Sequence, residues 1–218
     1  MRQVLLLSFL LLALSGCVTL DEYIEIRRNG SAKIVLSYSI SQEDLPLLND
    51  ADAVLNELAG QKQQGDMARI FDVEQMRKHF SGIEGIDIIS LRTSEDDGRV
   101  SMYMNIQVED FRGALRQGLL PYTTLEKAGS EYVFSASYPF NLSRLQPSSE
   151  LLEVMNSLEV SFKVKTPTMI TSTTALRKLA NLAEWTYSPE GTPFSRTDGR
   201  FIVRFEAGGL DFLDEAQP

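Results

Sequence analysis

Residues 18–40, VTLDEYIEIRRNGSAKIVLSYSI, carry the clearest secondary-structure signal of the chain. Apolar side chains alternate with polar ones over its second half, at Ile34, Leu36, Tyr38 and Ile40. This is the period of a β-strand with one buried face. The segment 18–27 is also strand-like, and Asn29-Gly30 supplies the positive φ angles of a tight turn. We therefore expect the folded domain to begin with a β-hairpin.

Immediately before this hairpin stands Leu14-Ser15-Gly16-Cys17, which contains the only cysteine of the chain. A basic residue, Arg2, and an apolar run over 4–14 precede it, the pattern of a secretory signal peptide. The tetrad resembles the lipobox of bacterial lipoproteins. That resemblance implies diacylation of the Cys17 thiol, cleavage after Gly16 and acylation of the freed amine. Residues 1–16 are then a cleaved signal peptide.

Two alternatives to lipidation stay open. The run 4–20 could be an uncut signal anchor, although about 20 apolar residues are needed to span a bilayer and Asp21 ends this run early. The segment could also be an ordinary signal peptide with an incidental cysteine. A free thiol is uncommon in an exported protein, which favours lipidation of Cys17.

Lipidation would attach the chain to a membrane of the cell envelope. Two or more acyl chains hold a protein stably. In the lipoprotein class, Val18 rather than aspartate after the cysteine favours the outer membrane, if the host has one, with the domain facing the periplasm or the cell surface. No long linker follows Cys17, so the first hairpin is expected close to the membrane.

The charge of the chain limits the classes of partner that it is expected to bind. The formal net charge is −9, and basic residues occur at most in pairs such as Arg27-Arg28. Nucleic-acid binding requires clustered Lys and Arg, so no nucleic-acid partner is expected. With Cys17 acylated, no disulfide can form, and the fold must be stabilised by packing.

The rest of the chain mixes helices and hairpins. Helical periodicity or capping residues predict helices over 41–59, 72–82 and 109–117, and one more from Ser149. Hairpins are predicted at 86–108, around Asp96-Asp97-Gly98, and at 122–138, around Ala128-Gly129. Further strands are expected over 158–165, 169–174, 183–188 and 200–206. The fold class is therefore α+β, with mainly antiparallel hairpins and three or four helices packed on the sheet, over a domain at 17–206 and an acidic flexible tail at 207–218.

The order of these elements resembles the LppM-like family of bacterial lipoproteins. The resemblance rests on Cys17-Val18-Thr19-Leu20 leading into the first hairpin, and on the late blocks 160–167 (VSFKVKTP) and 183–187 (AEWTY). Family members have a strand ending in proline, a polar turn and a strand with tryptophan. Here Thr173-Thr174 replaces an Asn-Gly pair in that turn. The family implies a fold and lends no established chemistry.

Catalytic and metal-binding patterns are missing from the sequence. The single histidine, His79, has Gln75 and Ile83 at the helical spacings where a second ligand would stand, and a solvated surface role fits it best. Asp96-Asp97-Gly98 fits a turn better than a calcium loop. Acidic pairs such as Glu43-Asp44 fit helix starts. We expect no enzymatic activity, no catalytic residue, no metal and no cofactor.

Aromatic residues are the remaining candidates for a site. They are Tyr132, Phe134, Tyr138, Phe140, Trp185 and Tyr187. Alternating aromatics on strands usually form the core, but they could also line a pocket for a lipid or peptide. We expect a non-enzymatic, membrane-anchored envelope lipoprotein that binds or assembles with a protein partner. A carrier of lipid or another hydrophobic ligand is the alternative, and an enzyme that uses carboxylates alone is a third class.

Overall fold

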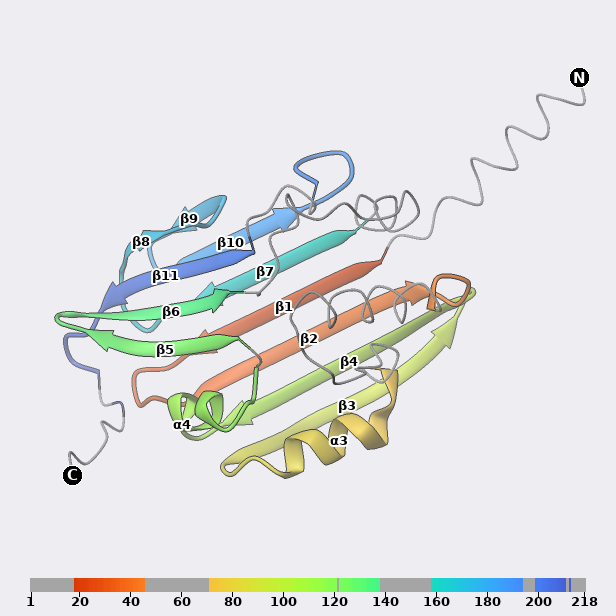
Figure 1. Ribbon diagram of the computed structural model, residues 1–218, viewed down its shortest axis with the longest axis horizontal. Helices are drawn as coiled ribbons and strands as arrows, with labels where there is room; N and C mark the ends of the chain where they lie inside the picture. The colour runs from red at the N-terminus through yellow and green to blue at the C-terminus, as the bar shows by residue number, and fades with distance from the viewer. Residues whose placement is uncertain are drawn as a thin grey trace, which may run out of the picture.

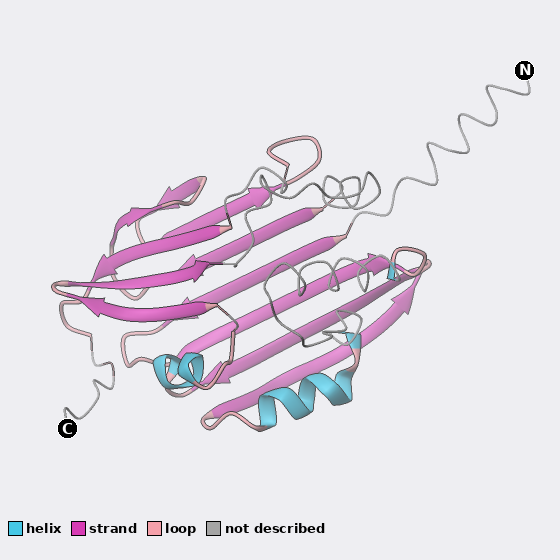
Figure 2. Cartoon of the chain, in the orientation of Figure 1, coloured by secondary structure: helices cyan, strands magenta, loops and turns pink. Residues whose placement is uncertain are grey.

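The structure is a computed structural model that describes residues 18–45, 71–120, 122–137, 158–193, 199–210 and 212. Strands dominate it (Figures 1 and 2). The larger sheet contains β1 (Thr19–Ile26), β2 (Ala32–Ser41), β3 (Ile86–Asp96), β4 (Arg99–Val108), β7 (Glu159–Lys165), β9 (Arg177–Leu179) and β10 (Leu182–Tyr187). The smaller sheet contains β5 (Thr123–Ala128), β6 (Glu131–Ser137), β8 (Ile170–Thr173) and β11 (Arg200–Glu206).

The strand order is β3-β4-β2-β1-β7-β10-β9 in the larger sheet and β5-β6-β11-β8 in the smaller one. All three predicted hairpins are confirmed, as β1–β2, β3–β4 and β5–β6, and pairing is antiparallel in each. The exception to antiparallel pairing is β1 with β7, which run parallel at the centre of the larger sheet. This pair joins the N-terminal strands to those of the last third of the chain.

The predicted fold class holds in part. Pairing is mostly antiparallel, but the strands form two sheets, and the fold is mainly β. In the described part of the chain there are two α-helices, α3 (Val73–Ser81) and α4 (Phe111–Arg116). The helices expected over 41–59 and from Ser149 lie almost entirely outside the described residues. Neither described helix is long and apolar enough to cross a membrane.

Capping residues explain where the two helices begin. The Asp72 side chain accepts from the main-chain N–H groups of Glu74 and Gln75 at the start of α3, as the sequence predicts. The Asp110 side chain accepts from the N–H of Gly113 at the start of α4. Each carboxylate satisfies donors that have no partner within the helix.

The first turn differs from the prediction. Gly30 has a positive φ of 81°, but Asn29 does not. Instead, the Arg27 carbonyl accepts from the Gly30 N–H at 3.1 Å, and the Asn29 side chain accepts from the Ser31 hydroxyl at 2.8 Å. The loop is therefore longer than a two-residue turn, and glycine is needed only at its fourth residue.

The smaller sheet packs face to face on part of the larger sheet. The smaller sheet lies over β1, β7 and β10 in Figure 1, and α3 runs beside β3 at the opposite edge. Phe162 of β7 is central to this contact, with ring centroids 6.2 Å from Phe134 of β6 and 5.3 Å from Phe201 of β11. One hydrophobic core thus spans both sheets.

Packing also reaches into the segment that was expected to be a flexible tail, 207–218. Phe212 is buried, and its ring centroid lies 4.5 Å from that of Tyr132. The core therefore extends at least to this residue.

Candidate functional site

Residues 166–181 connect the two sheets at one side of the molecule. The chain leaves β7, pairs with β11 as β8, and returns as β9 at the edge of the larger sheet. We call residues 166–181 the β8–β9 arm. Because β8 and β9 are terminal strands of their sheets, the arm closes the sandwich on this side.

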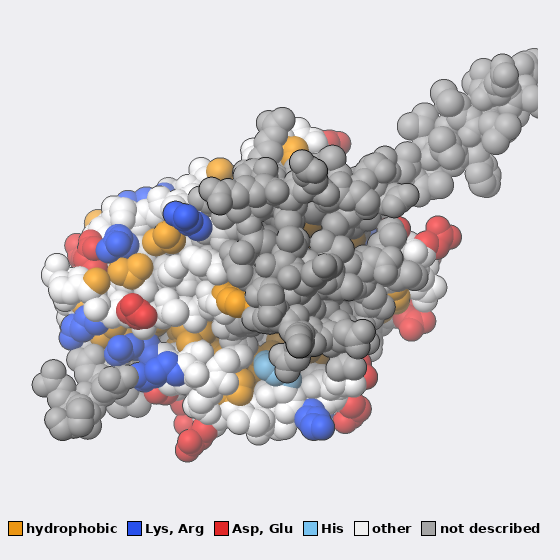
Figure 3. Space-filling view, in the orientation of Figure 1, with side chains coloured by type: hydrophobic (Ala, Val, Ile, Leu, Met, Phe, Trp, Pro, Cys, Tyr) orange, Lys and Arg blue, Asp and Glu red, His pale blue; other side chains and the backbone are white. Residues whose placement is uncertain are grey.

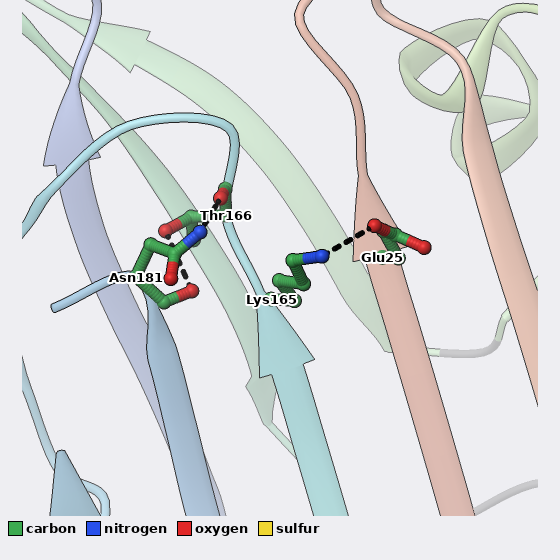
Figure 4. A network of polar contacts seen from close by, with 4 residues as sticks. All are labelled: Glu25, Lys165, Thr166 and Asn181. Carbon is green, nitrogen blue, oxygen red and sulfur yellow. Dashed lines mark hydrogen bonds and ion pairs between the residues drawn. The ribbon is translucent and has the colours of Figure 1, made fainter. Parts of the chain in front are cut away.

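Thr166, which is buried, and Asn181, which is partly buried, hold the base of the arm (Figure 4). The Thr166 N–H donates to the Asn181 carbonyl at 2.8 Å, and the Asn181 amide donates to the Thr166 carbonyl at 3.1 Å. The Thr166 hydroxyl donates to the Thr168 carbonyl at 2.7 Å. These bonds join the end of β7 to the start of β10 and fix where the arm leaves the sheet.

An ion pair stands beside this base. The Lys165 ammonium lies 2.8 Å from the Glu25 carboxylate on β1 (Figure 4). The hydrogen bond from Lys165 lowers the pKa of Glu25 and raises the pKa of Lys165. Both side chains are partly exposed, so the pair contributes about 0.2–1 kcal/mol. The pair joins two residues that face each other on β1 and β7, and its contribution to the free energy of folding is small.

The threonine hydroxyls of the arm bind the neighbouring main chain. Thr173 donates to the Ile202 carbonyl at 2.7 Å, and Thr174 donates to the Arg200 carbonyl at 3.0 Å. Thr168 donates to the Glu206 carbonyl. These hydroxyls are therefore used to attach the arm to β11, and they keep it in one position.

Large apolar side chains project from this fixed arm into solvent. The exposed fractions are 60% for Met169, 58% for Leu176 and 47% for Leu179. In the described part of the chain, five large hydrophobic residues are exposed, and three of them belong to the arm. The other two, Ile89 and Tyr122, lie outside it. Exposed apolar side chains in or next to the terminal strands of a sheet are candidates for an interaction surface.

Basic residues flank the apolar ones. Arg177 and Lys178 of β9 are exposed. The Arg177 guanidinium lies 3.4 Å from the Glu184 carboxylate, which also contacts Lys163 at 3.1 Å. The edge therefore combines apolar contact area with positive charge.

A carboxyl group lies on the inner face of the larger sheet. Glu22 shares the face of β1 that carries Leu20, Ile24 and Ile26, and it accepts a 2.6 Å hydrogen bond from the Tyr38 hydroxyl. On β1, β2, β4, β7 and β10 it is the one carboxylate that faces inward. Burial raises the pKa of Glu22, and the hydrogen bond from Tyr38 opposes that rise.

The structure places four of the predicted site residues inside the core. Tyr132, Phe134, Trp185 and Tyr187 are all buried. Trp185 stacks on Phe162 at 5.3 Å, and its indole N–H has no hydrogen-bond partner among the residues that the structure describes. Gly16, Cys17, Tyr138 and Phe140 lie outside the described residues.

The sequence also contained signals that the prediction did not use. Glu22 stands at an apolar position of the alternation 20–26, which marks it as an inward-facing carboxyl. The arm has no comparable signal, because its exposed apolar residues are too widely spaced for either strand or helix periodicity. Only the pairing of β8 and β9 with their neighbours shows that they lie at an edge.

In the residues that the structure describes, no group of three or more His, Cys, Asp or Glu is arranged to hold a metal ion. His79 is exposed on α3, where its ring meets that of Phe80 edge-on at 4.9 Å.

Comparison with known proteins finds a similar solved structure but does not assign the chain to a family. No family model matches the chain, and no curated protein matches its sequence. Among solved structures, the folded domain of the Mycobacterium tuberculosis LppM protein, determined by NMR, is similar to this chain with a TM-score of 0.46 and 13% identity. The alignment covers 88% of this chain and 91% of that one. A likeness at this level carries no information about function.

Proposed function

We propose that this chain is a membrane-anchored envelope lipoprotein that binds a protein partner through the β8–β9 arm. The exposure of Met169, Leu176 and Leu179 on an arm that is held by hydrogen bonds to the neighbouring strands supports the binding role. The motif Leu14-Ser15-Gly16-Cys17 supports the anchor. The partner presents an apolar segment with acidic residues, because Arg177 and Lys178 flank the exposed apolar side chains.

Metabolic labelling tests the anchor. Cells that express the chain with a C-terminal tag are grown with an alkyne fatty acid, and the purified protein is examined by mass spectrometry. We expect a label on Cys17, cleavage after Gly16 and loss of both in the variant Cys17→Ser. An unlabelled wild-type chain that retains residues 1–16 would favour the signal-anchor alternative.

Site-specific photocrosslinking in the same cells tests the partner. A photoreactive amino acid at Leu179 should trap one protein in stoichiometric amounts, and the same amino acid at exposed Gln107 of β4 serves as the control. The double variant Leu176→Ser, Leu179→Ser should lose the captured protein. Equal capture from both positions would contradict docking at the arm.

A second candidate function is carriage of an amphiphilic ligand on the inner face of the larger sheet. The observation that favours it is a carboxyl group, Glu22, on an otherwise apolar wall, with the unpaired indole N–H of Trp185 in the same cross-strand row. A ligand with an apolar body and a hydroxyl or amine group would suit these two positions.

Lipid analysis separates the two functions. Protein purified in mild detergent is extracted, and lipids other than the Cys17 acyl chains are quantified. One molecule of free lipid per chain, lost in Glu22→Leu, would support carriage. A lipid-free chain that retains its crosslinked protein would support the partner-binding function.

A further inference from the structure

The face of the larger sheet that points away from the smaller sheet continues the surface of the β8–β9 arm. Residues that pair directly on neighbouring strands project from the same face. Leu179 of β9 pairs with Leu182 of β10, which pairs with Lys165 of β7. Lys165 in turn pairs with Glu25 of β1. On β7 this row belongs to the half-buried residues, which alternate with the buried ones that face the smaller sheet. Figure 3 views the molecule from the side of the smaller sheet, so this row lies on the far face.

A second row of paired residues runs beside the first on the same four strands. Arg177 of β9 pairs with Glu184 of β10, and Glu184 pairs with Lys163 of β7. Lys163 pairs with Tyr23 of β1. The two rows are two residues apart on each strand, which is about 7 Å. We call the two rows together the basic strip.

The carboxylate of the second row is shared by two cations. Glu184 lies 3.1 Å from the Lys163 ammonium and 3.4 Å from the Arg177 guanidinium. The side chains of these cations are exposed by 39% and 67%, whereas that of Glu184 is exposed by 16%. A molecule that approaches this row therefore meets positive charge first.

The first row has the same excess of positive charge. Glu25 lies 2.8 Å from the Lys165 ammonium (Figure 4). This hydrogen bond is the main cause of the lowered pKa of Glu25, and the charges of Arg27 and Lys33 lower it further. Lys33 of β2 pairs with Glu25, so it adds a cation on the same face at the end of the row. The strip is thus a region of positive charge on a chain whose formal net charge is −9.

We infer that the basic strip binds an acidic segment of the protein partner, with the apolar end of that segment on the arm and its acidic end over β1. This inference rests on the proposed function and extends its site from the edge of the sheet toward the centre. Leu179 and Leu182 supply apolar contact at the arm end, and complementary charge sets the orientation of the segment. Asp21 is exposed on the same face, two residues before Tyr23, and would repel an acidic segment placed closer to Val18.

The dimensions of the basic strip suit a short protein segment. From β9 to β1 it crosses four strands, about 14 Å. A helix of about ten residues has this length. Apolar contact at one end and cations toward the other suit a segment whose two ends differ chemically, whereas a bilayer presents the same headgroups along this distance. A protein segment therefore fits the strip better than a membrane surface does.

Fluorescence anisotropy on the full chain in detergent tests the charge requirement. The first probe is a labelled helical peptide with leucines in its first half and glutamates in its second, and the other probe has glutamine in place of glutamate. We expect saturable binding of the acidic peptide and at least about tenfold weaker binding of the glutamine peptide. The double variant Lys33→Gln, Lys163→Gln should weaken binding of the acidic peptide by at least about tenfold. Arg177 still pairs with Glu184 in that variant, so the fold is preserved.

Arg92→Gln is the matched control, because it removes a cation from the same face but outside the basic strip. Arg92 pairs with Tyr103 of β4, near the opposite edge of the sheet. Its affinity for the acidic peptide should stay within about twofold of the wild type. Equal binding of the two peptides, or equal losses in Arg92→Gln and the double variant, would overturn the inference. Binding of short-chain phosphatidylglycerol but not of the acidic peptide would overturn it in favour of a lipid headgroup.

Photocrosslinking in cells separates this inference from the proposed function. A photoreactive amino acid at Tyr23 should trap the same protein that is trapped from Leu179, and the crosslinked fragment of that protein should be acidic. Capture from Leu179 but not from Tyr23 would overturn the inference and leave docking at the arm in place. Capture from neither position would contradict both.

Discussion

Glu22 is a partly buried carboxyl group on the inner face of β1. Its neighbours along the inner face of β1 are Leu20 and Ile24, and its hydrogen-bond donor is the neutral hydroxyl of Tyr38. Burial favours the protonated form and raises the pKa of Glu22. A raised pKa means that the folded chain holds this proton more tightly than the unfolded chain does.

Stability is therefore expected to depend on pH through Glu22. The stabilisation is fully present below the ordinary carboxyl pKa of 4.5 and is lost as the pH rises through the raised pKa. The variant Glu22→Gln keeps the acceptor for Tyr38 and removes the ionisation. We expect it to unfold at higher denaturant concentration than the wild type at pH 7 and to show a flatter pH profile.

Glu25→Gln is the control for that measurement, because the pKa of Glu25 is lowered by Lys165. Its contribution has the opposite sign: it is present above the ordinary pKa and is lost as the pH falls. An unchanged pH profile in Glu22→Gln would show that Glu22 titrates as if it were in water.

Thr166 is a second residue whose role can be measured. Its side chain is buried, and its hydroxyl donates to the Thr168 carbonyl at 2.7 Å. The isosteric change Thr166→Val leaves that carbonyl without its donor, and we expect a loss of about 1–2 kcal/mol in chemical denaturation. Thr171→Val, at an exposed position of β8, should change stability by less than about 0.5 kcal/mol. Equal losses would contradict a special role for the base of the arm.

At the scale of elements, the turn between β3 and β4 shows how local chemistry sets pairing. Asp97 and Gly98 both have positive φ angles, of 47° and 71°, and Asp96 pairs with Arg99. This geometry is a type I′ turn, which matches the twist of the two strands.

Gly98→Ala tests this turn by adding strain without a clash. A Cβ at Gly98 would meet no atom within 4 Å, so any loss arises from its positive φ. We expect thermal unfolding to indicate a loss of about 1 kcal/mol. Gly208→Ala is the control, because its Cβ also meets open space and its φ is not positive. A smaller loss at Gly98 than at Gly208 would count against the turn assignment.

The hairpins could be predicted from sequence because their signals are local. Asp96-Asp97-Gly98 and the alternation over 99–108 lie within one segment, and the structure reproduces them as β3 and β4. The strand β9 could not be predicted, because three residues, Arg177 to Leu179, carry no periodicity. Its place depends on its pairing with β10.

The candidate sites were predictable to different degrees. Residues 109–117 could be predicted as a helix, but only the fold brings β5 against that helix. Likewise, the parallel pairing of β1 with β7 joins residues as far apart as Glu25 and Lys165, 140 positions along the chain. Sequence patterns indicate which face of a strand is apolar. They do not indicate which strand pairs with it when the two are not joined by a hairpin turn.

At the scale of the whole molecule, Phe162 links the two sheets. Its ring contacts Phe134 and Phe201 of the smaller sheet and stacks on Trp185 of its own sheet. Loss of this ring would leave a cavity where the two layers meet.

Phe162→Ala should therefore destabilise the fold by about 3–5 kcal/mol. The chain has one tryptophan, Trp185, so its fluorescence reports directly on this contact during denaturation. Leu176→Ala, at an exposed position on the arm, should leave the same transition within about 0.5 kcal/mol of the wild type. A small loss in Phe162→Ala would indicate that the sheets hold together without this ring.

The position of β1 also determines how the domain bears mechanical load. A pull on Val18 enters a central strand that is bonded to β2 on one side and β7 on the other. Force along β1 shears both ladders at once, so their hydrogen bonds must break together rather than one after another. If Cys17 carries the proposed lipid anchor, tension on that anchor would enter the sheet through a strand that is bonded on both sides.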